Sequence, residues 1–215
     1  MELLEGLNEE DTRRLLASST RRRFARREVI FHEGDAADSL HLIDKGRIAV
    51  RITTAMGEVV TLDIIGAGQT LGELSLLPPP SRRGATAVAL EEVETRVISA
   101  EAFSELRASH PPVNEVLLGI LTARIRDLNE RLTEALYVPV EARVARRLLA
   151  VARQYGEGDG AVVVPLTQDD LAGLSGTTRE SVNRIVRRLQ TEGVLELRRG
   201  AVTILDGEKL DRLAR

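Results

Sequence analysis

A cluster of arginines in one short stretch carries the clearest chemical signal in this sequence. Arg179, Arg184 and Arg187 fall within residues 178–189, interleaved with apolar residues at helical spacing. The guanidinium fork of arginine matches the O6 and N7 acceptors of guanine, and a carboxylate such as Glu180 accepts from the amino group of cytosine. The stretch therefore predicts a helix that reads base edges in the major groove of DNA. A merely solvated charged face is the alternative.

Two short helices joined by a glycine turn are predicted to hold the arginines in place. Thr167 caps the first, whose first turn is acidic, and Ser175-Gly176 ends it. Thr178 caps the second, in which Val182, Ile185, Val186 and Leu189 form a buried stripe. This is a helix-turn-helix, followed by two small strands near 194–197 and 201–205. Double-stranded DNA is the expected partner, contacted by Thr167, Gln168, Thr178, Arg179, Glu180, Ser181, Asn183, Arg184, Arg187 and Arg198.

A heptad pattern precedes this motif. Its apolar positions are Leu118, Leu121, Ile125, Leu128 and Leu132, and the opposite face is strongly polar. Such a narrow seam is typical of a helix that pairs with a second copy, so we expect a homodimer. The alternative is an amphipathic helix packed on its own chain. The segment 137–140 contains Pro139, which predicts the end of the helix and a hinge.

Short apolar runs separated by glycine-rich or aspartate-rich turns fill residues 24–99. They lie at 29–31, 40–43, 48–52, 59–65, 85–90 and 93–98. Many short strands with such turns predict a β-barrel or sandwich. We expect helices over 7–19, 100–109 and 141–155, a loop over 156–160 and a strand over 161–165.

Composition excludes several classes of site. The chain has no cysteine, so disulfides, thiolate-held iron–sulfur clusters and cysteine nucleophiles are excluded. The three histidines show no metal-ligand spacing, so we expect no metal and no haem. An enzyme is disfavoured, because no Walker-type loop or histidine-based catalytic motif is found. No apolar run is long enough for a membrane span and residues 1–8 do not resemble a secretory signal, so we expect a cytoplasmic protein.

Charge is distributed unevenly along the chain. Residues 138–215 hold 13 basic against 11 acidic residues, whereas residues 1–137 hold 17 against 22. The C-terminal part is therefore the more basic one, as expected for the half that meets DNA.

With these residues identified, the chain resembles the bacterial cAMP receptor protein/FNR family of transcription regulators over nearly its full length. Residues 178–184 are similar to the family's recognition-helix signature, and residues 30–34 and 42–50 to its cyclic-nucleotide-binding β-roll. The resemblance implies palindromic GTGA-type half-sites and contact with RNA polymerase. It also implies a fold of class α+β: an N-terminal double-stranded β-helix (a jelly-roll-like β-roll), a long dimerisation helix and a C-terminal winged helix-turn-helix. The implied boundaries are 1–110, 111–137 and 138–215.

The family's phosphate-binding cassette resembles two pieces of this sequence. They supply Gly72, Glu73, Leu74, Arg83, Gly84 and Ala85 as ligand-binding candidates, joined by Leu128 and Asn129 from the long helix. The resemblance implies that Arg83 pairs with the phosphate of a cyclic nucleotide, cAMP in the first place, and that Glu73 accepts from its ribose hydroxyl. A proline run at 78–80 interrupts the cassette.

Two residues depart from the pattern of the cAMP binders. Gly84 stands where these usually carry serine or threonine, and Leu128 where they commonly carry threonine. Alternatives therefore remain: a ligand-independent regulator with a degenerate pocket, a site for another small anion, or a nucleotide-binding module that acts on a protein partner.

Overall fold

Two compact units make up the computed structural model, which describes residues 2–5, 7–77, 81–156 and 161–215. The first unit comprises Met1–Ile52 and Ile64–Asp127, and the second comprises Thr53–Asp63 and Leu128–Arg215. The proline run at 78–80 and most of the loop predicted over 156–160 lie outside the described residues.

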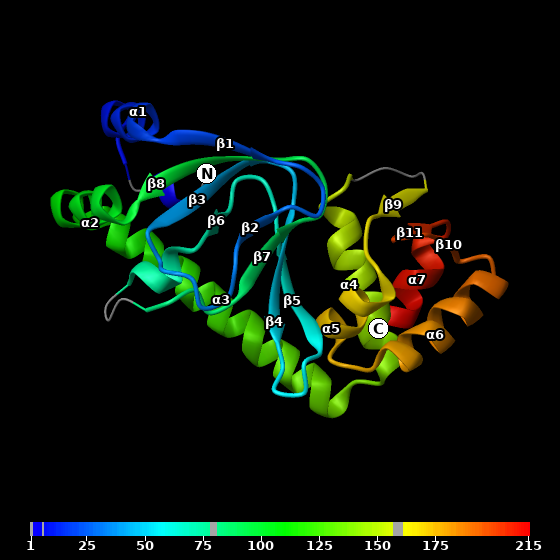
Figure 1. Ribbon diagram of the computed structural model, residues 1–215. Coiled ribbons are helices and arrows are strands. Elements are labelled where there is room, and N and C mark those ends of the chain that lie inside the picture. The colour runs from blue at the N-terminus through cyan, green and yellow to red at the C-terminus, as the bar shows by residue number, and fades with distance from the viewer. Residues whose placement is uncertain (1, 6, 78–80, 157–160) are drawn as a thin grey trace. The chain divides into compact units, whose positions relative to one another are not determined.

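Two antiparallel four-stranded sheets form the β part of the N-terminal region (Figure 1), and all their strands lie in the first unit except β4 and β5, whose residues 53 and 59–63 fall in the second. One has the order β1-β8-β3-β6 and the other β2-β7-β4-β5. The strands are β1 (Thr20–Phe24), β2 (Val29–Phe31), β3 (Ser39–Lys45), β4 (Ile48–Thr53), β5 (Val59–Ile65), β6 (Thr70–Leu71), β7 (Thr86–Ala89) and β8 (Val93–Ser99). The predicted antiparallel β architecture of the N-terminal part is confirmed.

Strands β1 and β6 were not predicted from the sequence. Strand β1 contains Arg21, Arg22 and Arg23, and four of its five residues are exposed, so it shows none of the alternation of a half-buried strand. It pairs with β8 through the backbone, and Phe24 at its end is buried among Ile43, Ile48 and Val93. The one apolar anchor at the end of the strand was too little for a pattern-based prediction.

Short helices flank these sheets. The 3₁₀-helix η1 (Glu2–Leu4) precedes α1 (Glu9–Ser18), which is capped by Asn8 as predicted, and η2 (Glu73–Leu76) follows β6. Helix α2 (Ala100–Ser109) brings Phe103 and Leu106 into a cluster with Leu40 of β3. These contacts anchor the sheet to the helices that follow it.

The long helix α3 (Pro111–Tyr137) begins at a proline. Proline is tolerated in the first turn because the backbone N–H there has no intrahelical partner. Val113, Leu117 and Ile120 bury one face of the N-terminal half, and Asp127 is the last residue of the helix in the first unit.

The second unit contains the predicted helix-turn-helix. Its elements after α3 are α4 (Val140–Arg153), β9 (Val162–Val164), α5 (Gln168–Ser175), α6 (Arg179–Thr191), β10 (Leu195–Arg198), β11 (Ala201–Ile204) and α7 (Gly207–Ala214). Strands β10, β11 and β9 form an antiparallel sheet in that order. Helix α7 was missed, because its apolar face is short and Leu210 is its only fully buried residue.

The fold class predicted from the sequence is confirmed: α+β, with an antiparallel β domain, a long helix and a C-terminal helix-turn-helix. Among the described residues, no helix is both long and apolar enough to cross a membrane.

Candidate functional site

Helices α5 and α6 are both fixed at their N-termini by threonine caps. The hydroxyl of Thr167 accepts from the backbone N–H of Asp170 (3.1 Å), and the Asp170 carboxylate accepts in return from the N–H of Thr167 (3.0 Å). This is a capping box, which satisfies two otherwise unpaired donors. Thr178 caps α6 by accepting from the N–H of Ser181 (3.3 Å).

The turn between the two helices depends on Gly176. Its φ of 59° lies in the left-handed region, and its N–H donates to the carbonyls of Ala172 and Gly173. Glycine adopts this conformation without the strain that a Cβ would cause. The turn glycine and both caps therefore occupy the predicted positions.

One face of α6 is buried and the other is open to solvent. Val182, Ile185, Val186 and Leu189 are buried as predicted. Of the predicted DNA contacts, Thr167, Thr178, Arg179, Glu180, Arg184, Arg187 and Arg198 are exposed, while Gln168, Ser181 and Asn183 are half-buried. The predicted base-reading residues thus share one accessible helix face.

Several of these side chains already have protein partners. Arg187 Nε donates to Asn183 Oδ1 (2.8 Å), and Arg198 in the β10–β11 hairpin pairs with Glu196 (3.2 Å). The pKa of Glu180 is lowered by a hydrogen bond from its own backbone N–H and by one from the Thr178 hydroxyl. Glu180 is thus an ionised acceptor on the exposed face of α6.

In the first unit, Arg83 is buried and held by backbone carbonyls. Its Nη1 donates to the carbonyl of Gly72 (3.0 Å) and its Nη2 to the carbonyl of Ser39 (2.6 Å). The guanidinium carbon stands 4.3 Å from the ring centroid of Phe31, a cation–π contact. Burial lowers the pKa of Arg83 from its usual value, with Asp38 opposing that shift.

Gly72 has two reasons to be glycine. Its φ is 92°, and a Cβ there would lie 2.5 Å from Arg83 Nη1. Gly84 has neither constraint, because a Cβ there would meet nothing within 4 Å. The lack of a hydroxyl-bearing residue at position 84 is therefore not imposed by packing.

Glu73 is the most deeply buried carboxylate of the predicted site. It is only 1% exposed, and Arg124 of α3 approaches its Oε1 to 2.6 Å. Arg124 also donates to the carbonyl of Thr70 (3.2 Å). Burial raises the pKa of Glu73, and the positive charge of Arg124 opposes that rise.

Buried polar atoms without partners provide a test of ligand fit. Within the described part of the chain, Glu73 Oε2 and Arg83 Nε have no hydrogen-bond partner. A buried acceptor and a buried cationic donor left without partners cost free energy unless a ligand satisfies them. A ribose hydroxyl could donate to Glu73 Oε2, and a phosphate oxygen could accept from Arg83 Nε. The residues present therefore fit a cyclic nucleotide.

The remaining ligand candidates are less buried. Leu74 is exposed, Gly84 is exposed and Ala85 is half-buried, all in the first unit. Leu128 and Asn129 are exposed residues of α3 in the second unit. The structure therefore brings Gly72, Glu73 and Arg83 together, and Leu128 and Asn129 stay predictions.

Most of the predicted dimerisation seam is exposed along α3. Leu118, Ile125, Leu128 and Leu132 are 59–62% exposed, and Leu121 is half-buried. A stripe of large apolar side chains facing solvent is a candidate surface for contact with another protein. Among the described residues, four of the five seam side chains are open to solvent, and their role in dimerisation stays a prediction.

His41 is a buried histidine of β3. Its Nδ1 lies 3.1 Å from the hydroxyl of Thr95, and the rings of Phe24 and Phe31 are each 6.1 Å away. Burial, followed by the positive charge of Arg83, lowers the pKa of His41 to about 4. This histidine is neutral at physiological pH, and no cluster of potential metal ligands was found among the described residues.

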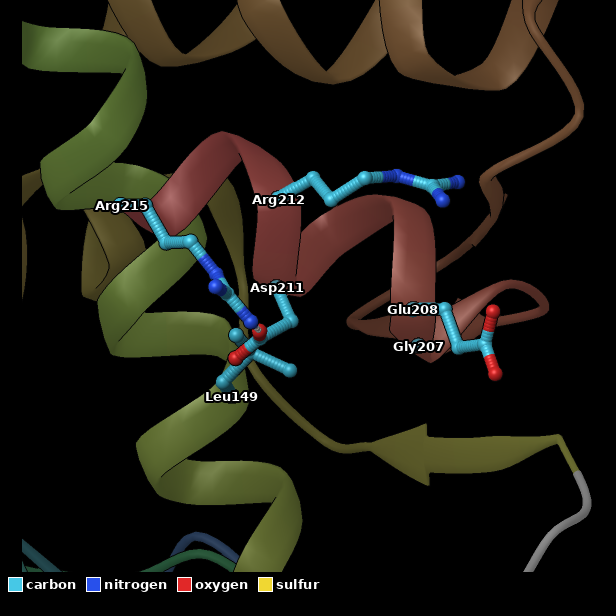
Figure 2. A pocket seen from close by; sticks show the side chains of 6 residues that line it. All are labelled: Leu149, Gly207, Glu208, Asp211, Arg212 and Arg215. Atoms are coloured by element: carbon cyan, nitrogen blue, oxygen red, sulfur yellow. Dashed lines mark hydrogen bonds and ion pairs between the residues drawn. The ribbon is translucent and has the colours of Figure 1, made fainter.

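A shallow pocket of the second unit contains none of the predicted site residues. It is lined by Leu149, Gly207, Glu208, Asp211, Arg212 and Arg215 (Figure 2). Asp211 and Arg215 pair across one turn of α7 (3.0 Å), so part of its charge is internally neutralised. The pocket lies at α7 and α4, on elements that do not belong to the predicted DNA-contacting face.

Two arginines were missed when the site was predicted from the sequence. Arg124 was assigned to the polar face of the long helix, yet it pairs with Glu73. Arg143 of α4 is only 8% exposed and hydrogen-bonds to five carbonyl oxygens. A possible signal for Arg143 is its place beside the buried Val144 and Ala145, where a solvated arginine is unexpected.

Comparison with known proteins agrees with both parts of this description. Residues 21–110 match the family model of the cyclic nucleotide-binding domain, and residues 142–213 match that of the Crp-like helix-turn-helix domain. The chain is 32% identical over 195 residues to the CRP-like cAMP-activated global transcriptional regulator of Mycobacterium tuberculosis, covering 89% of this chain and 87% of that protein.

Two further proteins extend the comparison. The cyclic AMP receptor protein of Thermus thermophilus is 32% identical over 212 residues, covering 99% of this chain and 96% of that protein. The structure of the c-di-GMP-responsive global regulator CLP of Xanthomonas campestris gives a TM-score of 0.77 over 92% of this chain and 99% of that one. At 23% identity, this is a likeness of fold alone.

The chain therefore belongs to the CRP/FNR family of transcriptional regulators. The resemblance inferred from the sequence is confirmed, together with the assignment to DNA-binding regulators that carry a cyclic nucleotide-binding domain. The two relatives are named as a global transcriptional regulator and a cyclic AMP receptor protein, and neither name describes an enzyme, which points to a non-catalytic protein.

Proposed function

We propose that this chain is a cytoplasmic, homodimeric transcription regulator that binds palindromic GTGA-type DNA under the control of a cyclic nucleotide, with cAMP as the first candidate. The nucleotide assignment depends on two buried side chains, Glu73 and Arg83. Each has a polar atom that lacks a hydrogen-bond partner among the described residues. Relatives named as cAMP-activated regulators support the choice of cAMP. RNA polymerase is the proposed protein partner, by membership of the family.

The proposed control begins at the contacts of Glu73. A bound cyclic nucleotide supplies a phosphate and a ribose hydroxyl, the groups that Arg83 and Glu73 are equipped to bind. Arg124 already joins Glu73 to α3, so any change in the partners of Glu73 alters a contact of the proposed dimerisation helix. Such a differential contact is what a ligand needs in order to shift a conformational equilibrium.

On the DNA side, the exposed face of α6 is proposed to read bases. Arg179, Glu180 and Arg184 share that face, and a two-fold dimer would present it twice, to half-sites about 34 Å apart. Arg198 in the β10–β11 hairpin is proposed to contact the phosphate backbone.

A gel-shift assay with a palindromic GTGA/TCAC duplex tests the DNA-binding part of the proposal. We expect sequence-specific binding that cAMP strengthens. Absence of specific binding at low salt, with and without cAMP, would refute the regulator function. Binding that is equally strong without nucleotide would favour the ligand-independent alternative.

The nucleotide site is tested by Arg83→Ala with Arg82→Ala as its matched control. We expect the wild-type protein to gain thermal stability on addition of cAMP and Arg83→Ala to lose that gain, because ligand binding stabilises only the folded state that can bind. Arg82 is exposed and donates to the carbonyl of Gly34, so its variant should keep the shift. If Arg83→Ala keeps the same cAMP-induced rise in thermal stability as Arg82→Ala, Arg83 does not belong to the site.

A further inference from the structure

Arg143 is buried at the point where three segments of the second unit meet. It is only 8% exposed, and its five hydrogen bonds within the described part of the chain all go to backbone carbonyls. None goes to a carboxylate. Its charge is therefore compensated by backbone dipoles, an arrangement that depends on where the chain places those carbonyls.

The first group of carbonyls belongs to the end of α3 and the hinge after it. Arg143 Nη1 donates to Ala135 (2.9 Å), to Val138 (3.1 Å) and, at a longer distance, to Glu134 (3.3 Å). The last carbonyls of a helix have no intrahelical donor, and a cation near them also interacts favourably with the helix dipole.

The second group belongs to the turn of the helix-turn-helix. Arg143 Nε donates to the carbonyl of Ser175 (3.0 Å), and Nη2 donates to that of Gly176 (3.2 Å). These residues end α5, and only Thr177 and Thr178 separate Gly176 from the start of α6. One planar guanidinium thus caps the C-termini of two helices. Its Nη1 binds the end of α3, and its Nε and Nη2 bind the end of α5.

From this geometry we infer that Arg143 is a positioning residue which fixes the direction of the recognition helix α6 relative to the end of the proposed dimerisation helix. The inference rests on the proposed function, because only in a DNA-bound dimer does that direction set the spacing between two recognition helices. The rigid fork of arginine is required, since a lysine ammonium has three donors at a single point and cannot span both carbonyl groups.

The test compares Arg143→Lys with Arg153→Lys, a matched control at an exposed arginine of the same helix. Binding is measured on palindromes whose half-site centres lie about 34 Å apart, here called the native spacing, or are separated by one or two additional base pairs. Wild type and Arg153→Lys should bind the native spacing best. Arg143→Lys should bind the native spacing about tenfold more weakly, because its recognition helices are no longer held in one direction, and it should discriminate less between spacings. Equal losses on every spacing, or an unchanged preference, would overturn the inference.

Amide hydrogen exchange tests the same inference without DNA. It therefore distinguishes a failure of this inference from a failure of the proposed DNA-binding function. The N–H groups of Val138 and Thr177 are bonded within the two capped segments, to the carbonyls of Glu134 and Ala172. Arg143→Lys should accelerate exchange at both segments and Arg153→Lys at neither. Acceleration at one segment only, or at neither, would contradict the inference.

A third measurement uses the wild-type protein alone and remains decisive if Arg143→Lys does not fold. In native-state exchange at low denaturant, Val138 and Thr177 should open in one cooperative step with a shared free energy, because one side chain holds both segments. Independent opening of the two segments, with different dependence on denaturant, would count against Arg143 as their link.

Discussion

At the scale of single residues, the proposed nucleotide site contains two residues that were named from the sequence, Glu73 and Arg83, and one that was not, Arg124. Glu73 and Arg83 belong to the stretch that resembles the family's phosphate-binding cassette, and that resemblance implied them as site residues. Arg124 flanks the seam of α3, where arginines are usually solvated, and only the folded β domain brings it to within 2.6 Å of Glu73. The burial that raises the pKa of Glu73 is likewise a property of tertiary packing.

Glu73→Gln should stabilise the ligand-free protein while removing its response to nucleotide. The pKa of Glu73 is raised in the folded state, so ionisation lowers stability as pH rises from its usual pKa through the raised one, and glutamine mimics the neutral form. We expect a higher Tm near neutral pH, a gain that shrinks as the pH falls towards 4, and no Tm shift with cAMP. Glu115→Gln, at an exposed residue of α3, is the control. A retained cAMP shift would contradict the proposed role.

His41→Gln should flatten the pH dependence of stability on the acid side. The pKa of His41 falls from 6.5 to about 4 on folding, so the unfolded chain binds more protons between those values. Stability should therefore decrease as pH falls from 6.5 to 4, by roughly 3 kcal/mol from this residue, and level off below.

Urea unfolding across that pH range measures the effect, as the difference between wild type and variant. His110→Gln provides the comparison, because His110 is only partly buried and pairs with Asp11. If wild type and His41→Gln lose stability in parallel, another group is responsible for the acid sensitivity.

At the scale of elements, prediction succeeded where local chemistry alone specifies the structure. Threonine caps, a turn glycine and an apolar stripe are local signals, and they placed α5 and α6 correctly. Strand β1 is held by backbone pairing with β8, and α7 by packing against α4. Backbone pairing leaves no local pattern in β1, whereas α7 has an Asp206 cap and an amphipathic face but spans only eight residues, so its short signal was overlooked.

Thr178→Ala should destabilise the second unit by loosening the start of α6. The Thr178 hydroxyl accepts from the N–H of Ser181, and loss of an N-cap of this kind costs about 1 kcal/mol. Chemical denaturation followed by circular dichroism measures the change. Thr191→Ala, at the other end of α6, removes only a hydroxyl that donates to the carbonyl of Arg187 and should cost much less. Equal effects of the two variants would argue against the cap.

At the scale of the whole molecule, the proposed dimer rests on the exposed seam of α3. Heptad spacing predicted the seam, and four of its five residues are 59–62% exposed. The predicted boundaries at residues 110 and 137 stay predictions, because the two compact units divide within α3, between Asp127 and Leu128. Sequence periodicity cannot place such a division in a continuous helix.

Ile125→Glu should dissociate the proposed dimer, because pairing would desolvate a charge in the seam without a partner. Analytical ultracentrifugation is expected to show monomers where the wild-type protein sediments as a dimer. Ala123→Glu is the matched control, since Ala123 is an exposed residue of α3 outside the seam. A dimer that persists in Ile125→Glu would place the interface elsewhere.

The proposed dimerisation seam and the arginine face of α6 consist of different residues, which has a genetic consequence. A variant altered at Arg179 keeps Leu118, Ile125, Leu128 and Leu132, and so keeps the proposed seam for pairing with wild-type chains. In a cell that makes both in equal amounts, random pairing would put at least one altered chain into about three-quarters of the dimers. Such alleles should be dominant, whereas alleles that place a charge in the seam should be recessive.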